Sequence, residues 1–120
     1  MNTACRPDDC ANPPVSVPSL ARARRSELIA LFKALGDETR LEVFRLIAAQ
    51  PDPICVCDIT SHFPVSQPTI SHHLKVLREA GLITVSRRGN WSFYAADPQA
   101  RPMLECLPQS LGLGSLAAVP

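Results

Sequence analysis

The sequence predicts a mainly α-helical domain with one small β-hairpin. Three observations carry this prediction. Apolar residues recur at helical spacing in successive segments, aspartate and serine stand where helices would begin, and a Gly89-Asn90 turn separates two strand-like segments. With 120 residues and 46% hydrophobic content, the chain suits a single domain that can bury a compact core.

Two helices are expected first. The first covers residues 20–34 and ends at Gly36, a residue favoured at helix C-termini. Its apolar repeat consists of Leu28, Leu31, Phe32 and Leu35. Asp37 is placed to cap the second helix, which stops before Pro51 and Pro53. The expected buried stripe of the second helix consists of Leu41, Phe44, Ile47 and Ala48.

A helix-turn-helix arrangement is expected next. A short helix over residues 56–63 turns Ile59 and Phe63 inward, and Ser66 caps a longer helix over residues 67–80. The core face of the longer helix consists of Ile70, Leu74 and Leu77.

A hairpin and a last helix complete the order. Residues 82–87 and 91–95 form the two strands, and a helix runs from Pro98 towards Leu107. Two helices, a helix-turn-helix, a hairpin and a helix predict a winged helix-turn-helix domain with helices added at both ends.

The chain divides into a central domain and two ends. Residues 1–19 are rich in proline and small polar residues, so we expect a flexible tail, unusual in holding Cys5 and Cys10. Residues 20–110 form the domain, and residues 111–120 a frayed C-terminus. No apolar run reaches the ~18–20 residues of a membrane span, and the N-terminus lacks a secretory signal. A cytoplasmic protein with no membrane partner is expected.

The helix that begins after Ser66 has the character of a DNA recognition helix. Such a helix presents short polar side chains from its first turns to the major groove, and an arginine-bearing hairpin can reach the flanking minor groove or backbone. The formal net charge is only +1, but a DNA footprint needs a basic face rather than a basic protein. The candidate DNA-binding residues are Gln67, Thr69, Ser71, His72, Lys75, Arg87, Arg88 and Asn90. His73 lies beside the apolar stripe and is expected to be a packed structural histidine.

Cys55 and Cys57 precede the recognition helix by a short distance. Because thiols stay reduced in the cytoplasm, the five cysteines of the chain are better interpreted as metal ligands or free thiols than as disulfide partners. Residues i and i+2 of a helix point about 200° apart, so the two thiols meet on one ion only if Cys55 lies outside the helix or the helix start deforms. A helix N-terminus is expected to favour the thiolate form. Further sulfur donors are Cys5, Cys10 and Cys106.

The number of sulfur donors separates the candidate ions. As(III) and Sb(III) take three sulfurs in a pyramid, Cd(II) and Pb(II) accept three or four, and Zn(II) prefers four ligands in a tetrahedron. Two thiolates are too few for a tight site, so other cysteines must contribute. The alternative is that both cysteines are merely small core residues.

These motifs resemble those of the ArsR/SmtB family of metal-responsive repressors. The resemblance covers roughly residues 31–96, and the segments that carry it are residues 31–41, 54–59, 66–83 and 89–94. It implies a homodimer with terminal helices at the dimer interface that binds a palindromic operator until metal binds. It also implies that Cys55 and Cys57 fall on the family's metal site at a helix start.

Two departures from the family pattern matter. Arsenic repressors of the common type have a third cysteine where this chain has Thr60, so the third sulfur must come from elsewhere. The cadmium/lead branch joins two tail cysteines to the pair, and Cys5 and Cys10 resemble that arrangement. The zinc site of many relatives requires histidines on the last helix. No histidine follows His73 in this sequence, so that zinc site is expected to be absent.

The leading hypothesis is therefore a dimeric operator-binding repressor released by As(III) or Sb(III). Its rivals are a Cd(II)- or Pb(II)-responsive repressor with four cysteine ligands, and a thiol-redox sensor that joins Cys55 or Cys57 to a tail cysteine. Among donors of a third sulfur we favour Cys10 over Cys5, because Cys10 requires less of the tail to be ordered. An enzyme is disfavoured, since no phosphate loop, carboxylate pair or oriented cysteine–histidine pair appears.

Overall fold

The computed structural model describes residues 19–113. Its elements are α1 (Arg22–Leu35), α2 (Glu38–Ala48), β1 (Ile54–Cys55), α3 (Val56–Ser61), α4 (Gln67–Glu79), β2 (Ile83–Arg88), β3 (Trp91–Ala96), α5 (Ala100–Glu105) and α6 (Leu107–Ser110). The predicted tail, with Cys5 and Cys10, lies outside the described residues except for its last position, as do residues 114–120. The order of elements confirms the predicted mainly helical fold with added helices at both ends.

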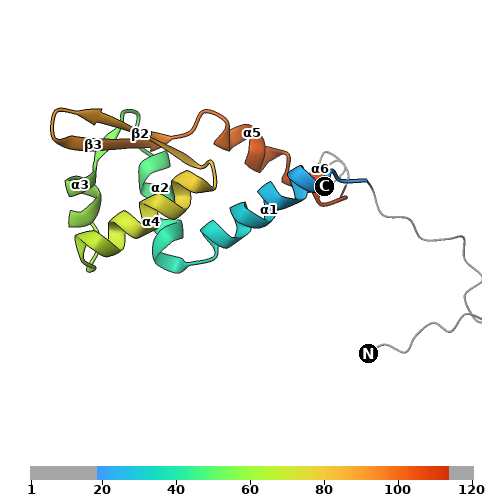
Figure 1. Cartoon of the computed structure of the whole chain (residues 1–120), viewed down its shortest axis with the longest axis horizontal. Helices are drawn as coiled ribbons and strands as arrows, with labels where there is room; N and C mark the ends of the chain where they lie inside the picture. The colour runs from blue at the N-terminus through green and yellow to red at the C-terminus, as the bar shows by residue number, and fades with distance from the viewer. Residues whose placement is uncertain (1–18, 114–120) are drawn as a thin grey trace, which may run out of the picture.

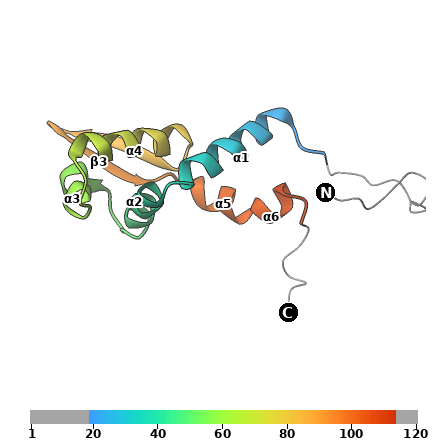
Figure 2. The same ribbon diagram turned by 90° about the horizontal axis from the view of Figure 1, so that it is seen from below.

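The elements separate into two ends (Figures 1 and 2). Helix α3, the start of α4 and the tip of the β2–β3 hairpin lie at one end. The first half of α1 lies with α5 and α6 at the other end. The predicted DNA-binding elements and the thiol pair are therefore grouped away from the first half of α1 and from α5 and α6.

One core joins the helices to the sheet. The predicted face of α4 is confirmed, because Ile70, Leu74 and Leu77 are all fully buried. Opposite them, α1 and α2 contribute their own buried residues, and the chain after α4 adds two more. These residues are Leu31, Ala34, Val43, Phe44, Ile47, Leu82 and Ile83. Packing of this core fixes which face of α4 remains in solvent.

The predicted caps of both inner helices are present. The Asp37 carboxylate accepts a hydrogen bond from the Arg40 backbone N–H at 3.0 Å, at the start of α2. Ser66 does the same for α4 through the Thr69 N–H. The residues that begin these helices are therefore set by local side-chain chemistry.

The sheet has one strand more than predicted. Strand β1 pairs antiparallel with β3, which gives the order β1-β3-β2. A strand of two residues has no alternating pattern to detect, and two prolines precede it closely. Its position depends on β3, which is distant in the sequence.

Three details of the predicted helices were wrong. In α2, Leu41 and Ala48 are exposed, whereas Val43 is buried, because the packed stripe runs through residues 40, 43, 44 and 47. The predicted helix over residues 56–63 ends at Ser61. The single predicted C-terminal helix is two short helices, α5 and α6, that meet at Cys106.

Candidate functional site

Helix α4 presents all its predicted DNA-binding side chains to solvent. Gln67, Thr69, Ser71, His72 and Lys75 are exposed, opposite the buried face of the helix. The Thr69 hydroxyl lies 3.0 Å from the Ser66 hydroxyl, so it is already part of the cap. The other four side chains take no part in the cap of α4. They are therefore better placed than Thr69 to contact a bound macromolecule.

A polar cluster anchors the inner face of α4 to the rest of the domain. His73 is only 9% exposed, which confirms the predicted structural histidine. Arg40 of α2 donates from Nη1 to Nδ1 of His73 at 3.3 Å, and from Nε to the Ala34 carbonyl at 2.6 Å. One arginine thus ties the end of α1 and the middle of α4 to α2. Sequence reasoning missed this role of Arg40.

Burial lowers the pKa of His73, and the positive charge of Arg40 acts in the same direction, while Asp37 opposes them. The folded protein therefore takes up this proton at lower pH than the unfolded chain, whose histidines titrate near 6.5. Stability from neutral His73 is complete above about pH 6.5 and is lost as pH falls through the lowered pKa. The pKa of Asp37 is also lowered, chiefly by the Arg40 backbone N–H, and its contribution is lost only in stronger acid.

We therefore expect the free energy of unfolding to fall as the pH drops below about 6.5. Each pH unit over which only the unfolded chain binds the proton costs at most about 1.4 kcal/mol. Urea unfolding at fixed protein concentration, measured between pH 7.5 and 5, tests this expectation. His73→Gln should flatten the dependence, because it removes the group whose pKa is lowered on folding. An equal slope in wild type and His73→Gln would contradict the assignment.

The β2–β3 hairpin forms the predicted wing. Its strands pair from Ile83↔Ala96 to Arg88↔Trp91, and Gly89 at the turn has a φ of 63°, which favours glycine. Arg87, Arg88 and Asn90 are exposed at the tip, as a DNA-contacting wing requires. Trp91 is also exposed there, at 56%. Sequence reasoning did not include Trp91, although its position directly after the turn indicated exposure.

The thiol pair stands at the start of α3. Cys55 is the N-cap residue, in extended conformation, and Cys57 lies in the first turn. This arrangement brings the two Sγ atoms to 2.8 Å from each other. One ion with bonds of about 2.3 Å, the length of a Zn–S bond, can reach both sulfurs, but a pyramidal or tetrahedral angle between the two bonds requires the sulfurs to move apart. Cys55 is buried and Cys57 is exposed, so the pair is accessible from one side.

The pKa of the Cys57 thiol is raised rather than lowered. The hydrogen bond with Cys55 is the main cause, and desolvation and the charges of Cys55 and Asp58 add to it. The expectation that the helix N-terminus favours the thiolate was therefore wrong for this residue, because a neighbouring thiol dominates over a short helix. An ion that binds both sulfurs must displace their protons.

A third ligand for the pair is not provided by the described part of the chain. Among residues 19–113, no three His, Cys, Asp or Glu side chains form a group that could hold a metal ion. Cys106 lies where α5 and α6 meet, at the opposite end from α3 (Figure 1). Within one chain the third sulfur therefore cannot come from Cys106 in this conformation. The two tail cysteines fall outside the described residues.

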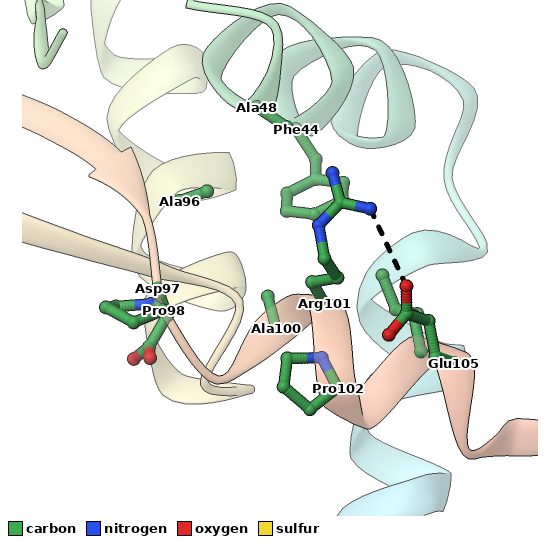
Figure 3. Close-up of a pocket in the computed structure, with 10 residues that line it drawn as sticks. Phe44, Ala48, Ala96, Asp97, Pro98, Ala100, Arg101, Pro102 and Glu105 are labelled. Atoms are coloured by element: carbon green, nitrogen blue, oxygen red, sulfur yellow. Dashed lines mark ion pairs between the residues drawn. The ribbon is translucent and has the colours of Figure 1, made fainter. Parts of the chain in front are cut away.

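A cavity of about 630 Å³ lies between α2 and α5 (Figure 3). Phe44 and small residues line it, and Arg101 at its edge pairs with Glu105 at 3.6 Å. No cysteine or histidine is among its lining residues, so it offers no soft-metal donors. The thiol pair and this cavity are separate features.

In residues 19–113, no helix combines the length and apolar character that crossing a membrane requires.

Comparison with known proteins identifies the family. The sequence profile described as "Bacterial regulatory protein, arsR family" matches residues 37–85. A protein of Halobacterium salinarum named "Putative arsenical resistance operon repressor ArsR2" is 36% identical over 105 residues, which cover 88% of this chain and 86% of the relative. The chain belongs to the ArsR family.

Two further relatives extend the ArsR-family assignment. The arsenical resistance operon repressor of Bacillus subtilis is 48% identical over 63 residues, covering 52% of this chain and 59% of the relative. The homodimeric winged helix-turn-helix DNA-binding domain of a possible ArsR-family regulator from Mycobacterium bovis superposes with a TM-score of 0.60. It is 25% identical, and the match covers 69% of this chain and 77% of that domain. As an ArsR-family member, the protein is a DNA-binding transcription regulator rather than an enzyme.

Proposed function

We propose that this ArsR-family protein is a repressor that binds operator DNA as a dimer and is released when As(III) or Sb(III) binds Cys55 and Cys57. The observation that carries the proposal is the 2.8 Å separation of the two Sγ atoms at the N-cap of α3. Helix α3 contacts α4, so a change at the thiols has a direct route to the recognition helix. We place this activity in the cytoplasm, where thiols stay reduced.

The ion is assigned from donor chemistry. Soft thiolate ligands select thiophilic ions, and a pyramidal three-sulfur site needs one thiolate beyond the pair. We assign that thiolate to Cys10 or Cys5 of the tail, with Cys10 favoured. Arsenical resistance relatives support a metalloid inducer. The alternatives are a Cd(II) or Pb(II) site that uses both tail cysteines, and a redox switch.

The DNA contacts are assigned from position and charge. We propose that Gln67, Ser71 and His72 contact base edges in the major groove, while Thr69 and Lys75 contact the backbone. Arg87, Arg88 and Asn90 at the wing tip would then lie along the flanking backbone or minor groove. In a dimer, two recognition helices would stand about 34 Å apart, one turn of DNA. The homodimeric relative from Mycobacterium bovis supports a dimer.

The two kinds of DNA contact should separate on mutation. Gln67→Ala is expected to relax sequence preference by ~1–3 kcal/mol at one base pair, because a bidentate base contact is lost. Arg87→Ala or Arg88→Ala is expected to weaken all sequences alike and to reduce the salt dependence of binding by about one phosphate contact each. Fluorescence anisotropy at several salt concentrations measures both effects.

Arg101→Ala provides the matched control for the arginine variants. It removes the same charge from an exposed arginine on α5, away from the wing. Its affinity and salt slope should equal those of the wild type. A wing without a DNA role would give Arg87→Ala and Arg88→Ala the same result as this control.

A single titration tests the whole proposal. Operator duplexes are first selected from random DNA by the reduced full-length protein. As(III), Sb(III), Cd(II), Pb(II), Zn(II) and peroxide are then titrated against the complex. Release by As(III) or Sb(III) alone supports the proposal, release by Cd(II) or Pb(II) alone supports the four-sulfur alternative, and release by peroxide without metal supports the redox switch.

A further inference from the structure

One face of the three-stranded sheet runs from the thiol pair to the tip of the wing. Cys55 of β1 stands opposite Phe93 of β3, and Phe93 stands opposite Ser86 of β2. Arg88 lies two residues beyond Ser86, so its side chain is on the same face. The sheet register therefore places Cys55, Phe93 and Arg88 in a diagonal row across three strands.

Phe93 contacts the arginine at the end of this row. The guanidinium carbon of Arg88 lies 4.7 Å from the centroid of the Phe93 ring. A guanidinium over an aromatic face at this distance is held by a cation–π interaction. Arginine otherwise has many rotamers, so the stack preselects one orientation of an exposed wing side chain before DNA arrives.

Phe93 also shares a cavity with the other end of the row. Cys55, Asp58, His62 and Phe93 are among the residues that line a cavity of about 400 Å³. On the opposite face of the same strand pair, Ile54 and Tyr94 are partly buried against the core, and Ile54 also reaches the cavity. Movement of Cys55 and Phe93 thus has free volume on one face, while the core resists movement on the other.

We propose that Phe93 is a positioning residue that couples the thiol pair to the DNA contact of Arg88. The inference rests on the proposed function of the thiols. When one ion binds both Cys55 and Cys57, the angle between its two bonds holds the sulfurs further apart than 2.8 Å, and the backbone of β1 shifts at the N-cap of α3. Strand β3 is hydrogen-bonded to β1 and follows it, so the Phe93 ring moves from under the guanidinium. Arg88 loses its orientation, and DNA affinity falls at the wing as well as at α4.

A double-mutant cycle in the full-length reduced protein tests this coupling. The variants are Phe93→Leu, Phe93→Tyr, Arg88→Ala and the Phe93→Leu/Arg88→Ala pair, with affinity for the selected operator duplex measured with and without arsenite. Phe93→Leu is expected to lower affinity about two- to five-fold without arsenite, because it keeps apolar volume but removes the aromatic face. When Arg88 is already replaced by alanine, Phe93→Leu should lower the affinity for DNA no further. Phe93→Tyr keeps the aromatic face and should bind DNA as tightly as the wild type.

The arsenite arm separates coupling from DNA contact. Phe93→Leu should bind arsenite as the wild type does, judged by thiolate absorption, yet show a smaller ratio between its affinities without and with arsenite. Phe63→Leu, at a phenylalanine packed on the core, is the control and should keep the wild-type ratio. Equal effects of Phe93→Leu with and without Arg88, or an unchanged arsenite ratio, would overturn the inference and leave the proposed function standing. Wild-type protein whose DNA affinity ignores arsenite would overturn both.

Discussion

Replacing Cys55 or Cys57 with serine is expected to leave operator binding within about two-fold of the wild type and to abolish release by inducer. Serine keeps the size of the side chain and can occupy the N-cap, but its hydroxyl is a poor ligand for a soft ion. Neither residue lies on the exposed face of α4 or at the wing tip. In the wild type, saturating arsenite should weaken operator binding about 5- to 150-fold, the usual range of coupling between two sites.

The remaining cysteines supply matched controls for this result. Cys106→Ser removes an exposed thiol at the far end of the molecule and should respond to arsenite normally. In a three-sulfur site, only one of the two tail variants, Cys10→Ser or Cys5→Ser, should lose the response to inducer. In a four-sulfur site, each of the two variants should lose it. Ligand-to-metal absorption of each variant reports binding independently of DNA. A Cys55→Ser protein that is still released by arsenite would exclude the proposed site.

Local sequence chemistry was sufficient for most of the helical fold. Asp37 and Ser66 accept hydrogen bonds from helix N–H groups, which is why the starts of α2 and α4 were predictable. Ile70, Leu74 and Leu77 repeat at helical spacing, and that repeat alone identified the buried face of α4. Exposure of the polar residues on the opposite face follows from the same repeat.

Features that depend on distant parts of the chain were not predictable in this way. Strand β1 exists because β3, about forty residues later, pairs with it. The buried stripe of α2 was misplaced because Arg40, a charged residue, takes a position on the packed face and turns Leu41 outward. Cys55 and Cys57 could be named as a pair from the sequence, but the raised pKa of the Cys57 thiol depends on a side-chain contact that the sequence does not specify.

The apolar residues of α1 divide between the core and solvent. Leu28 and Leu31 are buried within the chain and are not available to a partner. Leu104 and Leu107 are partly buried against the same core. The exposed large apolar residues of α1 are Ile29, at 49%, and Phe32, at 47%, which lie one helical turn apart. A dimer formed through α1 should therefore depend on these two side chains.

Phe32→Asp is accordingly expected to give a monomer that binds the full operator at least about a hundred-fold more weakly. A charge at the centre of an apolar contact must be desolvated without a partner, which opposes association. A dimer holds both half-sites together, so the second contact gains the effective concentration that a monomer lacks, an advantage of 10²–10⁴ in typical cases, by order of magnitude. Sedimentation gives the mass, and anisotropy gives the affinity.

Two comparisons distinguish lost dimerisation from lost folding or lost DNA contact. Affinity for an isolated half-site should be the same for Phe32→Asp and for wild type, since the recognition helix and wing of each protomer are unchanged. Leu41→Asp introduces the same charge at an exposed leucine, 36% exposed on α2, and should remain a dimer. If Phe32→Asp sediments as a dimer, α1 does not form the interface. If it is a monomer with wild-type affinity for the full operator, each protomer binds alone, and the two-fold operator geometry must be abandoned.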